Sequence, residues 1–260
     1  MNGMLKCFAM VIFFLTLTNC SNQNEHLEMP NEDKQSSCTM FNQLKEMSHA
    51  HSKGLDFCFN RYNSALLEKR ALDFSRKRTN EFCINFATNE SAFAICPETR
   101  SALNANEILS DTIVRPLSSN AEKMLESFMD KLFEAPNADA IYSYIQNLME
   151  TENFLSLGKE EQPFLLFMML IGVDSAQYWS NPTNAEKWER LKRMEPTNET
   201  RGVAGPSASY WMTSEQIKSP NFKRLLEADM RGCGWSLLSG ISTYGWMIGG
   251  IAGSVDAALF

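Results

Sequence analysis

Apolar residues recur at helical spacing through most of the chain, with charged residues on the opposite face. The clearest stripe lies in SSNAEKMLESFMDKLFEAPN and consists of Met124, Leu125, Phe128, Met129, Leu132 and Phe133. Ser119 and Glu122 stand at the spacing of a capping box just before it, so a helix is expected to begin there. The next stretch, NADAIYSYIQNLME, repeats the pattern after an Asn-Ala-Asp start.

Four further segments predict helices. The segment GLDFCFNRYNSALLEKRALDFSRKR, residues 54–78, carries apolar residues on one face. In KEEQPFLLFMMLIGVDSAQYW the apolar run is solid, which predicts a helix buried on most sides, with Pro163 in its first turn. Thr183 and Glu186 are expected to cap NAEKWERLKRM, while Ser219 and Pro220 begin SPNFKRLLEADMRGC. Because no segment alternates apolar and polar residues, the prediction is an all-α fold, an irregular helical bundle.

Composition shifts along the chain divide it into five parts. They are a signal peptide at 1–19, a flexible tether at 20–36, a helical body at 37–195, a loop or linker at 196–218, and a helix followed by a glycine-rich apolar tail at 219–260. The tether has almost nothing apolar to bury, and the linker is rich in Gly, Pro, Ser and Thr.

The first twenty residues have the layout of a secretory signal: one early cation, Lys6, then an apolar run, then small and polar residues. The segment from Leu17 to Cys20 resembles the lipobox of bacterial lipoproteins. That resemblance implies that Cys20 is acylated as the first residue of the mature chain and that membrane lipid is its partner. Simple secretion with cleavage nearby is the alternative.

Charge argues against one class of partner. The net charge is -7, the pI is near 5.1, and no run of Lys or Arg stands out. A nucleic-acid or anionic-lipid surface would require such a basic run, so no nucleic-acid partner is expected.

The cysteines suggest an oxidising compartment. Four of the seven, Cys38, Cys58, Cys83 and Cys96, fall in one stretch, and Cys233 stands alone in the tail. In an exported protein such an even cluster predicts disulfides. Sequence does not choose among the three pairings, although two antiparallel helices would nest Cys58 with Cys83 and Cys38 with Cys96. Buried free thiols are the alternative, and the spacings do not fit a zinc site.

Motifs for catalysis are missing from the sequence. It contains no serine nucleophile elbow, no phosphate-binding glycine loop and no HExxH, so no enzyme activity and no cofactor are predicted. His49 and His51 form an H-x-H pair, but on a helix that spacing is expected to turn the two rings to different sides, so no metal site is predicted. Asp174, Tyr178 and Trp179 could line a groove for a sugar or peptide, with core packing as the alternative.

The last third of the chain carries a weak family resemblance. Ser175-x-x-Tyr178-Trp179, followed by Ala228-Asp229 and the Gly-rich tail, resembles a loose group of uncharacterised exported proteins from the Bacteroidota. This resemblance implies export but no activity.

The tail contains Gly245, Gly249 and Gly253, a glycine zipper that would place one bare strip along a helix and allow a second backbone to approach closely. Three interpretations stay open: association with a membrane, packing against the protein's own body or another copy, and removal during maturation. Together these patterns predict an exported, lipid-anchored, non-enzymatic protein of the bacterial cell envelope whose tail mediates membrane or self-association. The alternatives are a secreted toxin-like or antimicrobial protein whose tail perturbs membranes, and a hydrolase using Asp174.

Overall fold

The computed structural model describes residues 32–70, 74–89, 117–159, 161–197, 210–232 and 242–259, and within them it describes side chains except at 32–38, 76, 87–89 and 242–248. Every regular element in these ranges is a helix and none is a strand, which confirms the all-α prediction. The helices are α2 (Glu32–Leu67), α3 (Arg76–Asn89), α6 (Ser119–Glu134), α7 (Ala138–Met149), α8 (Glu152–Leu155), α9 (Glu161–Ser180), α10 (Pro182–Lys192), α11 (Ser214–Lys218), α12 (Pro220–Gly232) and α13 (Ser242–Leu259).

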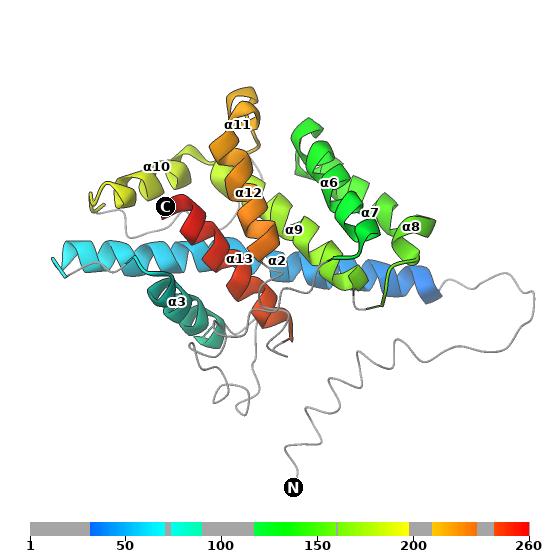
Figure 1. The fold of residues 1–260 in the computed structure, drawn as a ribbon, viewed down its shortest axis with the longest axis horizontal. Coiled ribbons are helices and arrows are strands. Elements are labelled where there is room, and N and C mark those ends of the chain that lie inside the picture. The colour runs from blue at the N-terminus through cyan, green and yellow to red at the C-terminus, as the bar shows by residue number, and fades with distance from the viewer. Residues whose placement is uncertain are drawn as a thin grey trace, which may run out of the picture.

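The long helix α2 runs the length of the molecule, with α6, α7 and α8 toward its N-terminal end and α3 and α10 toward its C-terminal end (Figure 1). The helix α9 makes its most extensive contact with α2. Every residue of α9 from Phe164 to Ser180 is buried, because its apolar residues face all directions and neighbours cover each of them. This confirms that the solid apolar run is the core helix, with Pro163 in its first turn.

The segment predicted as a single helix over 54–78 is two helices. α2 ends at Leu67 and α3 begins at Arg76. Lys69 adopts a left-handed conformation with φ of 53°, and Arg70 N–H donates to the carbonyl of Ala65. This is the geometry with which helices commonly end. Glycine usually occupies the left-handed position at such an end, and here Lys69 does. The break between the two helices could therefore not be predicted from the sequence.

Two predicted helix caps are wrong by one or two residues. Ser118, not Ser119, is the N-cap of α6, and its hydroxyl accepts from Ala121 N–H. Asn181, not Thr183, caps α10, because Pro182 occupies the first helical position and places the cap directly before itself. At α12 the prediction is confirmed, since Ser219 Oγ accepts from Phe222 N–H ahead of a helix that begins at Pro220.

The C-terminal segment does not stand apart from the body. α13 packs most extensively against α12, and it also contacts α2, α3 and α10. The predicted boundaries therefore shift: α2 already begins inside the segment expected to be a tether, α11 lies inside the expected linker, and residues 242–259 belong to the body. Among the described helices, none is both long and apolar enough to span a membrane.

Candidate functional site

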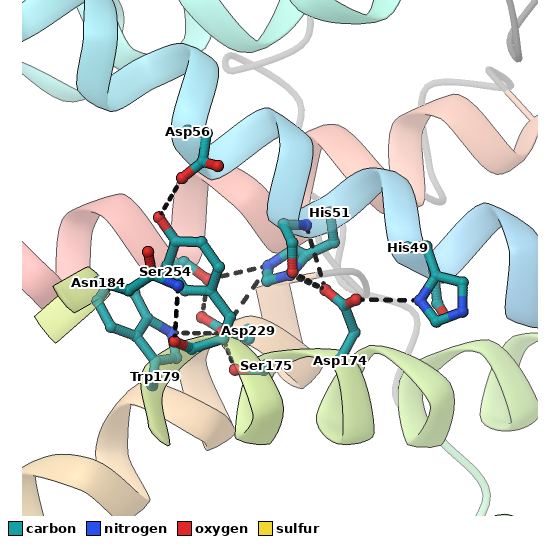
Figure 2. A network of polar contacts seen from close by, with 12 residues as sticks. His49, His51, Asp56, Asp174, Ser175, Trp179, Asn184, Asp229 and Ser254 are labelled. Carbon is teal, nitrogen blue, oxygen red and sulfur yellow. Dashed lines mark hydrogen bonds and ion pairs between the residues drawn. The ribbon is translucent and has the colours of Figure 1, made fainter. Parts of the chain in front are cut away.

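Four helices place polar side chains into one buried network. His51 comes from α2, Asp174 from α9, Asp229 from α12 and Ser254 from α13, and none of the four is exposed to solvent. In Figure 2 the imidazole of His51 lies between the two carboxylates. A buried carboxylate is costly unless it is paired and hydrogen-bonded, so the partners of each group decide what this site can do.

Asp174 is fully partnered. Its Oδ1 lies 3.3 Å from His49 Nδ1, and its Oδ2 lies 3.2 Å from His51 Nδ1. Ser52 donates to the same Oδ2 from both its backbone nitrogen, at 3.1 Å, and its hydroxyl, at 2.5 Å. Burial works to raise the pKa of Asp174, but the hydrogen bonds from the two histidines and Ser52 and the charge of His51 outweigh it, so the pKa lies below its usual value. Asp174 is the ionised member of the network.

His51 connects the two carboxylates. Its Nδ1 bonds Asp174, its Nε2 lies 3.1 Å from Ser254 Oγ, and the same Nε2 lies 3.8 Å from Asp229 Oδ2. Burial works to lower the pKa of this imidazole, but the hydrogen bond to Asp174 and the charges of both carboxylates raise it above its usual value. With both ring nitrogens protonated, His51 donates to Asp174 and to the Ser254 oxygen.

Asp229 is as fully buried as the other members of the network. Its Oδ2 accepts from Trp179 Nε1 at 3.1 Å and from the Ser175 hydroxyl, and its Oδ1 accepts from the Ser254 hydroxyl. Burial raises the pKa of Asp229 to about 7, although the His51 charge and the hydrogen bonds from Ser175 and Trp179 work to lower it. Below that pH the site holds one anion, Asp174, and one cation, His51, and it is electrically balanced.

A second polar cluster adjoins the network at α10. The Tyr178 hydroxyl donates to Asp56 Oδ1 at 2.8 Å and accepts from Trp188 Nε1 at 3.0 Å, and Lys187 Nζ pairs with the same Asp56 oxygen. Burial lowers the pKa of Lys187, and Asp56 restores part of that loss. This cluster ties α2, α9 and α10 together.

The sequence left open whether Asp174, Tyr178 and Trp179 line a groove or pack in the core. All three side chains lie in the core, with at most 3% of their surface exposed. The two aromatic rings pack edge-on with centroids 5.1 Å apart, and the Trp179 ring also packs against Trp188. Core packing, the alternative, is what the structure shows, because α9 is covered on every face.

The prediction that the rings of His49 and His51 point to different sides of their helix is wrong. Both rings reach the same carboxylate, one to each oxygen of Asp174. His51 is enclosed, whereas His49 approaches from the rim with 30% of its side chain exposed. The sequence predicted neither contact, because the partner is more than 120 residues away. Within the described residues, no group of three or more His, Cys, Asp or Glu side chains has the geometry to hold a metal ion.

Sequence reasoning did not single out Asp229 or Ser254 as members of a site. A signal for Asp229 was present, because it shares one helical face of α12 with the buried Phe222, Leu226 and Met230. A carboxylate on an apolar face needs a buried partner. Ser254 carried no such signal, since small hydroxyl residues occur throughout the tail.

Two of the four clustered cysteines come together. Cys58 of α2 and Cys83 of α3 are both buried, and their sulfur atoms lie 3.7 Å apart as free thiols. No disulfide is therefore present between them in this structure. Burial and the neighbouring Cys58 raise the pKa of the Cys83 thiol. The structure does not describe the side chain of Cys38. It also does not describe Cys96, Cys233 or the lipidation candidate Cys20.

Two of the tail glycines, Gly249 and Gly253, lie where α13 crosses α12. A Cβ atom on Gly253 would stand 2.6 Å from the carbonyl oxygen of Ala228, and one on Gly232 would overlap the carbonyl of Gly249. Two pairs of small residues, each separated by three positions, therefore face each other across the contact, as in close-packed helix pairs. The helix α13 includes Gly245, whose surroundings lie outside the described side chains.

The hydrogen bonds Asp174–His51–Ser254 follow the order carboxylate, imidazole, hydroxyl, which is the order of a hydrolase triad. Here, however, the serine is enclosed and also donates to Asp229. Ser254 lies on α13 itself, so a movement of that helix to admit a substrate would also take the serine away from His51. As it stands, the arrangement can hold and exchange protons between buried carboxylates. No protein-family model, no curated protein and no solved structure matches the chain.

Proposed function

We propose that the chain is an exported, lipid-anchored protein of the bacterial cell envelope with a non-enzymatic role, built as a disulfide-braced helical body. The lipobox-like segment from Leu17 to Cys20 supports the anchor. The enclosure of the His51 network supports a role that does not require a substrate at that site.

The observation that carries the proposal is the approach of Cys58 to Cys83. The two sulfur atoms lie 3.7 Å apart, and a disulfide requires about 2.05 Å. To form the bond, the two sulfur atoms would have to approach by the difference between these distances. This pair is the inner pair of the nested arrangement expected of two antiparallel helices. In the oxidising compartment the two thiols would lose two protons and two electrons to the disulfide of a thiol oxidoreductase, which becomes a dithiol.

In this proposal the C-terminal helix α13 packs against the rest of the protein. The small residues that would support association with a membrane or a second copy face α12 instead. Association through that face therefore requires α13 to leave its site, and association without such movement must use another surface.

The test is the intact mass of the full chain purified from its native host without reductant, with free thiols blocked during lysis. The proposal predicts a chain that begins at an acylated Cys20 and carries a Cys58–Cys83 disulfide. A Cys20→Ser variant should lose the acyl mass and stay soluble after lysis, and a Cys58→Ser variant should lose only the disulfide. An unmodified N-terminus with both thiols blocked would overturn the proposal.

A second candidate function, a serine hydrolase, has one specific observation in its favour: the bond order Asp174–His51–Ser254. An activity would need a substrate to reach Ser254 while α13 still holds that serine against His51. The test is covalent labelling of the full chain by a fluorophosphonate probe. Labelling that disappears in Ser254→Ala would support the hydrolase, while no labelling of the folded protein, with active trypsin as the positive control, would reject it.

A further inference from the structure

We infer that the docked C-terminal helix α13 seals the Cys58–Cys83 pair, so that another molecule can oxidise or reduce these two sulfur atoms only while α13 is away from them. The inference deepens the proposed function and rests on it for the disulfide. The seal itself is a property of the folded chain and depends on neither export nor lipidation.

The two thiols are fully enclosed. Neither Cys58 nor Cys83 exposes any surface, although their sulfur atoms lie only 3.7 Å apart. Thiol–disulfide exchange requires the attacking sulfur to come into direct contact with the sulfur that it attacks. A disulfide carried by another molecule therefore cannot react with either thiol while the helices around the pair stay in place.

Helix α13 contacts both of the helices that carry the thiols (Figure 1). Gly54, one turn before Cys58 on α2, lies so close to α13 that a Cβ atom there would overlap the Ile251 side chain. The same Cβ atom would crowd Phe86, which lies about one turn after Cys83 on α3. The three helices therefore meet beside the sulfur atoms, and α13 is part of what covers them.

The same cover suppresses the reactive form of the thiol. The thiolate is the species that attacks a disulfide. Burial, the neighbouring Cys58 and the negative charge of Asp256 on α13 all raise the pKa of the Cys83 thiol. When α13 leaves, water reaches the pair and the Asp256 charge moves away with the helix. Access and ionisation therefore improve together.

Helix α3 is held on α2 by contacts that involve no residue of α13. The Tyr62 ring of α2 packs edge-on against Phe82 of α3 with centroids 5.0 Å apart, and its hydroxyl lies 2.7 Å from Thr79 Oγ1. These contacts keep the two thiols side by side when α13 leaves. A movement of α3 would instead carry Cys83 away from Cys58 and prevent a bond between them. Departure of α13 is thus the movement that exposes the pair and keeps it together.

The order of events follows from the seal. With α13 away, one thiolate of the pair attacks the disulfide of a thiol oxidoreductase, and the second thiolate attacks the resulting mixed disulfide to give the Cys58–Cys83 bond. The pair loses two protons and two electrons, and the oxidoreductase leaves as a dithiol. Docking of α13 then covers the new bond against reductants. The folded protein consequently keeps the redox state that the pair had when α13 docked.

The experiment measures alkylation of the two thiols by iodoacetamide in the full chain, purified in reductant so that both start free. A peptide map follows Cys58 and Cys83 separately from the other cysteines. In the wild type both should react at least about a hundredfold more slowly than in urea-unfolded protein, because only rare openings expose them. Gly253→Ala, which pushes α13 away from α12, should speed both reactions about tenfold.

Ile145→Val is the matched control, because it costs comparable stability in the core of α7, a helix that packs on α8 and α9. Its two thiols should react within about twofold of the wild-type rate. Equal acceleration in the two variants would show that the whole protein must unfold before the thiols react, and would overturn the seal. An unchanged rate in Gly253→Ala, or wild-type alkylation as fast as in urea, would overturn it as well.

If Gly253→Ala does not fold, the urea dependence of wild-type alkylation decides. Departure of α13 exposes less surface than global unfolding, so alkylation below the unfolding transition should rise less steeply with urea than the unfolding constant does. Equal slopes would overturn the seal. A protein from the native host that lacks the disulfide would contradict the proposed function and leave these results unchanged, because the experiment begins from free thiols.

Discussion

At the scale of single residues, the fold depends on how Asp174 is paired. This carboxylate accepts from His49, His51 and twice from Ser52, and burial leaves it no water to replace any of them. The imidazolium of His51 needs the carboxylate equally. Removing one member of such a buried pair leaves the other uncompensated, which typically costs about 3–5 kcal/mol.

The substitution Asp174→Asn should therefore lower the free energy of unfolding by about 3–5 kcal/mol, measured by urea denaturation at pH 6. His49→Ala is the matched comparison, because it removes the partly exposed partner of the same carboxylate and should cost about 1 kcal/mol or less. Equal losses in the two variants would show that the buried contact with His51 contributes no more to stability than the partly exposed contact with His49.

The sequence could not predict contacts between residues that lie far apart in the chain. Asp174 was considered as a groove residue together with Tyr178 and Trp179, and its full burial was not foreseen. Its partners were not foreseen, since they lie on α2, far away in the chain. The aromatic residues Tyr178 and Trp179 suggested a groove, but stacking surfaces for a ligand and for other core rings have the same composition.

At the scale of elements, the contact between α12 and α13 depends on residues without side chains. Gly253 and Gly232 let the two backbones approach until a methyl group would not fit between them. Backbone atoms cannot rotate aside as a flexible side chain can. A substitution there must push the helices apart along their whole contact.

Gly253→Ala should accordingly destabilise the protein by about 1–3 kcal/mol, the range for overpacking in a core, as measured by thermal or urea unfolding. Gly158→Ala is the control, because a Cβ there would meet nothing closer than Glu161 Cβ at 4.0 Å. A neutral Gly253→Ala would mean that α13 does not sit on α12 as described.

Helices were the easiest elements to foresee, and their ends were the hardest. The apolar stripes of α6, α7 and α9 and the Ser219-Pro220 start of α12 were read directly from the sequence. The break between α2 and α3 was missed because Lys69, rather than glycine, takes the left-handed conformation. The tail's packing partner could not be chosen, since spaced glycines fit a membrane helix and a soluble helix pair equally well.

At the scale of the whole molecule, the buried network makes stability depend on pH. Asp174, whose pKa is lowered, contributes above about pH 4 and loses that contribution as the pH falls further. Asp229 and His51, whose pKa values are raised, lose theirs as the pH rises through neutrality. The network therefore favours the folded state most in mildly acidic solution.

The free energy of unfolding should be about 2 kcal/mol greater at pH 5 than at pH 7, because the folded state keeps a proton on Asp229 that the unfolded state has released. One such proton changes the free energy by up to about 1.4 kcal/mol per pH unit. Urea titrations in one buffer series of constant ionic strength would measure this. Asp229→Asn should lose most of the difference, and a wild type that becomes more stable toward pH 7 would contradict the sign.

The glycine-rich C-terminal helix is part of the folded core rather than a free tail. The most direct measurement is hydrogen exchange of the wild-type full chain at pH 5, comparing residues 242–259 with the core helix α9. We predict that both segments exchange slowly, as buried helices do. Complete exchange of residues 242–259 within seconds, while α9 stays protected, would contradict the claim.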